Sequence, residues 1–199
     1  METLPEQRVA AVVLAAGAST RLGQAKQLVR VGGESLLRRT VRIAAEAGCF
    51  PVVVVLGFEA ERMEAELEGM PAEVLVFPEW AEGMGSSLRC GVEAVRRSDP
   101  PSDAVMVLVC DQPRLSAEHL RALLTQHRTS AVPITASVYA GKTGVPAVFA
   151  REAFPELQGL QGDRGARNLI RRRADRVQGI SWSDGSVDLD VQEDLRGVD

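Results

Sequence analysis

The chain has 199 residues, of which 45% are hydrophobic and 25% charged, with a formal net charge of −4. These are ordinary globular values, so they exclude a disordered or fibrous chain, and the length predicts one domain spanning residues 1–199. The negative net charge argues against nucleic acid as the main partner. An anionic substrate would therefore have to be held locally, by a few placed cations and a metal ion.

The apolar runs and the cysteines indicate the cellular compartment of the protein. The longest apolar runs have the length of strands, so we expect no membrane span, and the N-terminus lacks the basic-then-apolar pattern of a secretion signal. Cys49, Cys90 and Cys110 are odd in number and far apart, which fits neither a disulfide framework nor a zinc site. A cytoplasmic protein without a membrane partner is the expectation.

Strand-like and helix-like stretches alternate along the chain, which is the pattern of a parallel sheet with crossover helices. The predicted strands are 9–14, 52–56, 74–76, 104–109, 134–139, 147–149 and 177–182. The predicted helices are 35–47, 59–68, 86–97, 117–127, 151–157 and 166–172. A turn is expected at 140–144, and no internal repeat or long linker divides the chain.

The loop after the first strand is the most informative segment. Its small residues let backbone N–H groups approach a phosphate, and two cations add positive charge at the same place. It is not a P-loop, because Gln24 rather than lysine follows Gly23, and it lacks the glycine spacing of a dinucleotide fingerprint. The alternative is an ordinary strand-to-loop junction with incidental surface cations. We predict a polyphosphate site formed by Leu14, Ala15, Ala16, Gly17, Ser19, Arg21 and Lys26.

Acidic residues near two other segments suggest a metal site. Asp111 follows the strand 104–109, at the sheet edge where open α/β proteins bind ligands, and a carboxylate beside phosphates suits Mg²⁺. The alternative is a turn-forming aspartate ahead of Pro113. Asp188 and Asp190 lie two apart, so in an extended segment both face one side and complete the site. The alternative there is a solvated acidic tail.

A second small-residue loop opens the helix 86–97. Its residues are Gly83, Met84, Gly85, Ser86 and Ser87. The helix start offers unpaired N–H groups to an anion or a base edge, whereas plain capping explains only the serines. The two glycines indicate that something packs against the backbone. The segments 139–149 and 162–167, rich in turn formers and cations, are surface loops that would suit an acidic second substrate.

Together these motifs resemble the molybdenum cofactor (molybdopterin) cytidylyltransferases, a subgroup of the nucleotidyltransferases related to molybdopterin guanylyltransferase. The resemblance covers residues 12–195 and includes the segments 14–26, 80–88, 110–113, 144–149, 162–167 and 188–190. The Ala-Ala-Gly form of the first loop is similar to the cytidine enzymes, because guanylyltransferases usually have Leu-Ala-Gly-Gly. Phe77 and Val191-Gln192 depart from the pattern.

The resemblance implies a three-layer α/β/α, Rossmann-like (GT-A-like) nucleotidyltransferase fold with a mostly parallel sheet. It implies transfer of CMP from CTP to the terminal phosphate of molybdopterin, with release of pyrophosphate. Arg21 and Lys26 would hold the β- and γ-phosphates, and Asp111 with Asp190 or Asp188 would hold Mg²⁺. The implied acceptor-binding residues are Gln112, Pro113, Gly144, Pro146, Asp163 and Arg167.

Other readings of the same residues remain open. One is the same chemistry with GTP or UTP, or on another phosphorylated acceptor. The other is a non-catalytic accessory module that binds the cofactor and delivers it. A molybdoenzyme or its maturation chaperone would be a further partner in either case.

Overall fold

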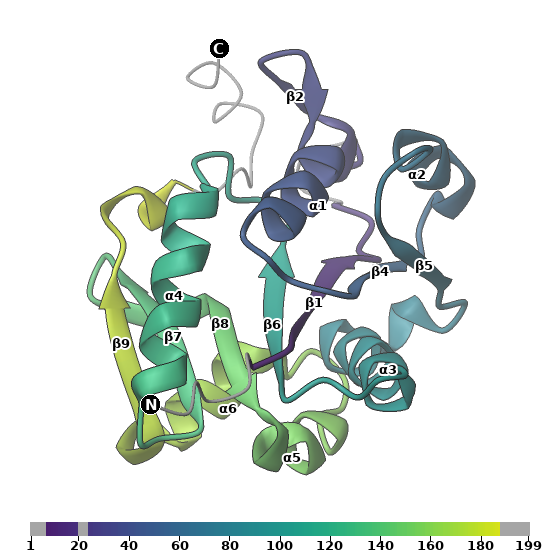
Figure 1. Cartoon of the computed structure of the whole chain (residues 1–199). Helices are drawn as coiled ribbons and strands as arrows, with labels where there is room; N and C mark the ends of the chain where they lie inside the picture. Colours follow the sequence, from purple (N-terminus) through teal and green to yellow (C-terminus); the bar gives the residue numbers. More distant parts are fainter. Residues whose placement is uncertain (1–6, 20–23, 188–199) are drawn as a thin grey trace.

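The computed structural model describes residues 7–19 and 24–187. Its centre is a seven-stranded sheet in the order β5-β4-β1-β6-β8-β7-β9 (Figure 1). The strands are β1 Val9–Ala15, β4 Val52–Leu56, β5 Glu73–Val76, β6 Ala104–Val109, β7 Ile134–Tyr139, β8 Lys142–Ala150 and β9 Val177–Ser181. The pairs β4–β5, β1–β4, β1–β6 and β7–β9 are parallel, and β8 runs antiparallel to both of its neighbours. The expected mostly parallel α/β sheet is confirmed.

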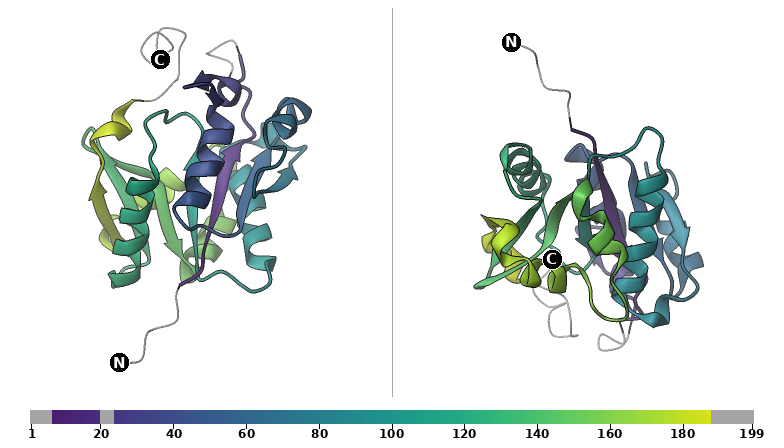
Figure 2. Two further views of the ribbon diagram at one scale, coloured as in Figure 1. Left: turned by 45° about the horizontal axis from the view of Figure 1, so that its top comes forward. Right: turned by 90° about the horizontal axis from the view of Figure 1, so that it is seen from below.

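Helices cover both faces of this sheet and make three layers (Figure 2). One face carries α1 Leu36–Glu46, α2 Ala60–Glu66 and α4 Ala117–Thr129; the other carries α3 Met84–Arg97, α5 Phe154–Gln158 and α6 Ala166–Arg172. No helix in the described ranges is both long and apolar enough to cross a bilayer.

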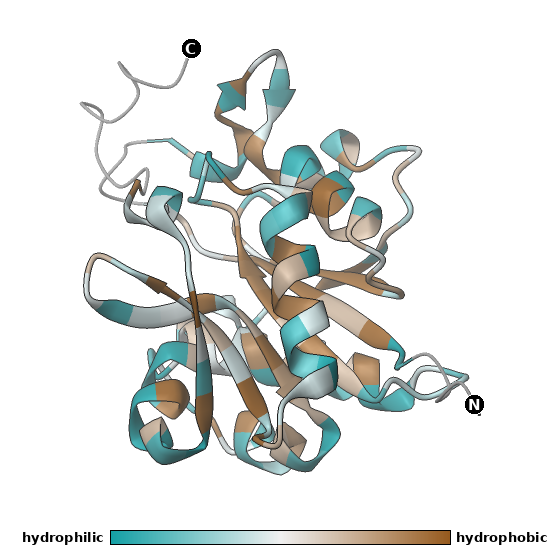
Figure 3. Cartoon of the chain, turned by 60° about the vertical axis from the view of Figure 1, so that its left-hand side comes forward, coloured by the Kyte–Doolittle hydropathy of each residue, from teal (hydrophilic) through white to brown (hydrophobic). Residues whose placement is uncertain are grey.

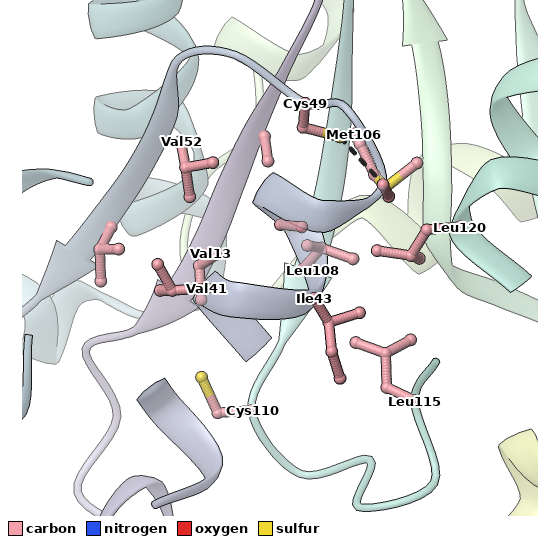
Figure 4. Packing of buried hydrophobic residues seen from close by; sticks show 14 of the residues in the cluster. Val13, Val41, Ile43, Cys49, Val52, Met106, Leu108, Cys110, Leu115 and Leu120 are labelled. Atoms are coloured by element: carbon pink, nitrogen blue, oxygen red, sulfur yellow. Dashed lines mark hydrogen bonds between the residues drawn. The ribbon is translucent and has the colours of Figure 1, made fainter. Parts of the chain in front are cut away.

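Alternation along the buried strands gives each face its own core. In β1, Val13 faces the α1 side and Val12 faces the α3 side, as expected for a strand covered on both faces. Figure 3 shows hydrophobic strands at the centre and hydrophilic outer faces on the helices. Figure 4 shows the α1-side core, where Cys110 and Leu108 of the β6 segment join Val41 and Ile43 of α1.

The register of β1 and β6 positions the segments that follow them. Leu14 pairs with Val109, so the loop after β1 and the residues after β6 leave the sheet side by side at its carboxyl edge. Open α/β sheets bind ligands at this edge. The convergence of the first loop with Asp111 is therefore built into the strand pairing.

Several local predictions differ from the structure. The predicted turn at 140–144 is too long, because β8 begins at Lys142 and pairs with Tyr139. Only Ala140 and Gly141 form the turn, both with positive φ, which is the two-residue geometry that matches strand twist. The short hairpin β2 Arg30–Val31 and β3 Glu34–Ser35 was not predicted. The segment 151–157 divides into a 3₁₀ turn, Arg151–Ala153, and α5.

Candidate active site

A cavity of about 440 Å³ lies at the carboxyl edge, where β1 and β6 end. Its walls come from the first loop, the 3₁₀ turn η1 Lys26–Leu28, the start of α3, the end of β6 and one residue of the loop before α6. The lining residues are Leu14, Ala16, Gly17, Ser19, Lys26, Gln27, Trp80, Ala81, Gly83, Met84, Ser87, Val109, Cys110, Asp111 and Asp163. Segments far apart in the sequence thus share one cavity.

Gln27 fixes the first loop in place. Its side-chain Nε2 donates to the carbonyl oxygens of Ala15, at 3.1 Å, and Gly17, at 2.9 Å. Ser19 Oγ donates to Gln27 Oε1 at 3.4 Å and accepts from the backbone N–H of Lys26 at 3.2 Å. Gln27 is 3% exposed, so these bonds are shielded from water. Sequence analysis missed this residue; its only signal was its place directly after Lys26.

Two of the predicted charges meet in the cavity. Lys26 Nζ donates to Asp111 Oδ2 at 2.6 Å, and the two side chains are 23% and 21% exposed. A phosphate can replace the carboxylate beside Lys26, and a metal ion can replace the ammonium group beside Asp111. The pair therefore neutralises the charges of Lys26 and Asp111 until a phosphate and a metal ion bind together.

Cys110 lines the same cavity, but its thiol is unreactive near neutral pH. Burial raises the pKa of the Cys110 thiol to about 12, and the negative charge of neighbouring Asp111 adds to the effect. The thiol therefore stays protonated near neutral pH, and a thiol is a poor nucleophile. No histidine belongs to the cavity wall in the described ranges.

The second loop packs against another part of the chain. The backbone N–H of Gly85 donates to the Gly162 carbonyl at 2.7 Å. A Cβ on Gly83 would lie 2.5 Å from the Gly162 carbonyl carbon, and one on Gly85 would lie 2.8 Å from the Arg164 oxygen. The prediction that something packs against these glycines is confirmed, and its identity is the chain's own segment 162–164.

The start of α3 departs from the prediction. The helix begins at Met84 after an N-cap at Gly83, which makes no side-chain cap. Ser86 and Ser87 are therefore buried inside the first turns, so the alternative of plain capping does not explain these serines. Gly83, Met84 and Ser87 line the cavity, whereas Gly85 and Ser86 are buried and do not line it.

The residues expected to bind an acceptor take up different positions. Asp163 lines the cavity, and Arg167 lines a second cavity described below. Pro113 is buried, and Gln112, 5% exposed, donates through Nε2 to the Val145 carbonyl at 3.1 Å.

The segment 144–146 is fastened to β7. Tyr139 Oη donates to the same Val145 carbonyl at 3.1 Å, and Ser137 Oγ donates to the Pro146 carbonyl at 2.7 Å. A Cβ on Gly144 would lie 2.9 Å from Tyr139 Oη, so the glycine admits the tyrosine. The Val145 carbonyl, which also accepts from Gln112, thus ties the β7–β8 hairpin to the segment that carries Asp111.

Three predicted residues, Arg21, Asp188 and Asp190, lie outside the described residues. Within residues 7–19 and 24–187, no group of three or more His, Cys, Asp and Glu side chains could hold a metal ion. Asp111 is thus the described carboxylate beside Lys26 that can serve as a metal ligand, and it needs oxygen atoms from a substrate or from water to complete the coordination.

Comparison with known proteins places this geometry in a family. Residues 11–177 match the family model described as a MobA-like NTP transferase domain. The chain is 32% identical over 192 residues to the nicotine blue oxidoreductase of Paenarthrobacter nicotinovorans, covering 92% of this chain and 91% of that protein. It is 31% identical over 169 residues to the purine catabolism protein PucB of Bacillus subtilis, covering 80% and 79%.

Solved structures share the fold of this chain. Rv0371c from Mycobacterium tuberculosis H37Rv superposes with a TM-score of 0.81 and 30% identity, covering 96% of this chain and 97% of that chain. A structure of Rv0371C in complex with manganese superposes with a TM-score of 0.76 and 28% identity, covering 96% and 98%.

Proposed function

The chain belongs to the MobA-like NTP transferase family and is a nucleotidyltransferase, and we propose that it transfers CMP from CTP to the terminal phosphate of molybdopterin. The Lys26–Asp111 pair, 2.6 Å apart inside the cavity that the first loop lines, is the main observation in support of this reaction. The choice of CTP rests on the Ala-Ala-Gly form of that loop, and the acceptor rests on the resemblance of the motifs.

In this reaction a phosphate oxygen of the acceptor attacks the α-phosphorus of CTP in line. The new P–O bond forms as the bond between the α-phosphorus and its bridging oxygen breaks, and pyrophosphate leaves with that electron pair. Lys26 contacts the β- and γ-phosphates and stabilises the charge that grows on the leaving group. The acceptor phosphate is already an anion, so no protein base is required, and the protonated Cys110 thiol agrees with that.

The residues present fit a magnesium ion. Mg²⁺ prefers one or two carboxylates with phosphate oxygens and water, and Asp111 offers a carboxylate at the cavity wall. When bound, the ion would neutralise charge on the triphosphate oxygens. The manganese complex of Rv0371C supports a divalent ion in a relative of this fold. We propose Asp190 or Asp188 as the second ligand and Arg21 as a second phosphate contact.

Pyrophosphate release tests the proposal. The purified chain would be incubated with CTP, GTP, UTP or ATP and Mg²⁺, each with and without molybdopterin. We expect release with CTP only when molybdopterin is present, and little in the Asp111→Asn variant. Release with GTP but not CTP would contradict the cytidylyl assignment, and tight binding without release would identify an accessory module.

A redox arm belongs in the same experiment, because one relative is named an oxidoreductase. A reduced nicotinamide dinucleotide and a redox dye would be supplied without any triphosphate. We expect no turnover above the rate without protein. Turnover that survives Asp111→Asn would contradict the proposed reaction and point to a reaction that does not use the Lys26–Asp111 pair.

A further inference from the structure

A second cavity, of about 690 Å³, lies beside α6 on the face of the sheet that α6 covers. It shares no lining residue with the first cavity. Its walls come from the tip of the β7–β8 hairpin, the exposed side of α6 and the edge strand β9, which Figure 1 shows at the end of the sheet. The lining residues are Gly141, Lys142, Thr143, Arg167, Asn168, Ile170, Arg171, Ala174, Val177 and Gly179.

Cationic side chains line this second cavity on two sides. Lys142 comes from the hairpin, while Arg167 and Arg171 stand one turn apart on the same side of α6. No ion pair joins any of the three to a carboxylate in the part of the chain that the structure describes. The neighbouring Arg173 and Arg176, in contrast, pair with glutamates at 2.8 Å and 2.7 Å.

This charge is local, because the whole chain is negative. Three like charges around one hollow repel one another, and a bound anion relieves that repulsion. Arginine forks match the oxygens of a phosphate two at a time, which a single lysine cannot do. The arrangement therefore favours a phosphate group with two negative charges.

The floor of the second cavity has a different character. Val177 is partly exposed and presents apolar surface there, and Gly179 adds no side chain, so a flat or apolar body can lie on the strand. Ile170 is 1% exposed and belongs to the core beside it. Asn168 at the rim supplies both a hydrogen-bond donor and an acceptor. A ligand that fits is charged at one end and apolar at the other.

We propose that this second cavity binds a phosphate monoester with a flat or apolar body, separately from the nucleotidyl-transfer reaction. Lys142, Arg167 and Arg171 hold the phosphate, and the body lies along Val177 and Gly179. Arg167 thus contacts this ligand rather than the occupant of the first cavity. The site goes beyond the proposed function, because it uses none of the residues assigned to CTP or the metal.

Amide NMR of the full ¹⁵N-labelled chain tests the proposal with phenyl phosphate as the probe. The amides of Thr143, Asn168 and Gly179 report on the second cavity, and those of Gly17 and Ser19 report on the first. We expect saturable shifts in the first group. Removing either arginine, in Arg167→Ala or Arg171→Ala, should weaken this binding about ten-fold. Lys142→Gln on the hairpin gives a third variant should an α6 variant fail to fold.

Arg172→Ala is the matched control, because Arg172 follows Arg171 on the same helix and does not line the second cavity. It should bind phenyl phosphate as the unmodified chain does. Inorganic phosphate and benzyl alcohol, each tested alone, should both bind more weakly than phenyl phosphate. The proposal is overturned if Thr143, Asn168 and Gly179 do not shift, if Arg172→Ala loses as much affinity as Arg171→Ala, or if either partial probe binds equally well. None of these readouts depends on pyrophosphate release.

Discussion

The two halves of the sheet differ in the polar groups that they hold beside the strands. In the parallel half, which consists of β5, β4, β1 and β6, the edge carries the ion pair of Lys26 and Asp111 inside the first cavity. In the hairpin half, β8, β7 and β9, neutral side chains on β7 bond to a histidine of α4 and to backbone carbonyls of β8. The first cavity therefore contains a pair of opposite charges, whereas this network of the hairpin half is neutral and holds β7, β8 and α4 together. The cations of the hairpin half line the second cavity instead.

The neutral network of the hairpin half is built around a histidine. The ring of His119 stacks on Trp182 with centroids 4.6 Å apart, and its Nε2 lies 2.8 Å from Ser137 Oγ. Since Ser137 Oγ donates its proton to the Pro146 carbonyl, it accepts from His119 Nε2–H. Burial lowers the pKa of His119 to about 4, so the ring is neutral at physiological pH. This network braces the hairpin that Gln112 contacts.

The largest expected effect lies in the parallel half, at Asp111. Asp111→Asn keeps the shape of the side chain and removes the charge that holds the metal ion. We expect turnover with CTP and Mg²⁺ to fall on the order of a thousand-fold, equivalent to about 4 kcal/mol. Asp175→Asn on the surface is the control and should match the unmodified chain. Near-normal turnover of Asp111→Asn at low Mg²⁺ would move the metal to another residue.

Lys26 gives the next effect in size. If its ammonium group contacts the β- and γ-phosphates, Lys26→Ala should weaken CTP about ten- to a hundred-fold, because a charge-assisted contact is worth about 1.5–3 kcal/mol. CMP lacks those phosphates, so its affinity should change little, and GTP should lose as much as CTP. Isothermal titration with the three nucleotides measures this, with Arg97→Ala as a surface control. Equal losses for CTP and CMP would place Lys26 elsewhere, for example on the acceptor phosphate.

Much of the parallel half could be predicted because its signals are local. The valine-rich run 52–56 has the length and composition of a strand buried on both faces, and Gly48 ends the preceding helix. Parallel strands bring their carboxyl ends to one edge, so the first loop and Asp111 could be expected to meet. The structure places Lys26 and Asp111 at hydrogen-bond distance there.

The remaining contacts join segments whose separation no local pattern reveals. In the sequence Gln27 is an ordinary polar residue, yet its side-chain amide donates to the Ala15 and Gly17 carbonyls and holds the first loop. The glycine pair in the second loop showed that something packs there, but not that it is the segment 162–164. Arg167 shares a motif with Asp163, yet the start of α6 turns the two toward different cavities.

Gly85 lies where the two halves meet, because α3 packs on the parallel half and the segment 162–164, which Gly85 contacts, belongs to the hairpin half. A substitution at Gly85 therefore tests how tightly the two halves pack. In Gly85→Ala the new methyl group would lie 2.8 Å from the Arg164 oxygen and 2.9 Å from the Gly162 oxygen. These are backbone atoms that cannot swing aside, so we expect a loss of about 1–2 kcal/mol in the free energy of unfolding. Gly159→Ala is the control; its Cβ has 3.5 Å of space, and its effect should stay within about 0.5 kcal/mol. Equal urea midpoints for the two variants would show that Gly85 and the segment 162–164 are not tightly packed.

The smallest effect concerns the two histidines of the chain, His119 and His127, which lie on α4 and face the hairpin half. Burial lowers the pKa of each to about 4, below the ordinary 6.5 that the unfolded chain has. Above the unfolded pKa both states are neutral, so the full stability is present. As pH falls toward 4, the unfolded state binds protons that the folded state excludes, and the free energy of unfolding decreases.

The slope of that decrease can be divided between the two residues. Each histidine contributes at most about 1.4 kcal/mol per pH unit in the window between about pH 6.5 and pH 5, where most carboxylates are still ionised. His127 bonds Thr135 through Nδ1 at 3.1 Å, and His127→Gln keeps a polar group there that does not titrate. Urea unfolding across this window should show about half the slope of the unmodified chain for His127→Gln, and CTP affinity at neutral pH should not change. An unchanged slope would mean that the pKa of His127 is the same in the folded and unfolded chain. A change in CTP affinity would mean that the neutral network of the hairpin half takes part in binding the nucleotide.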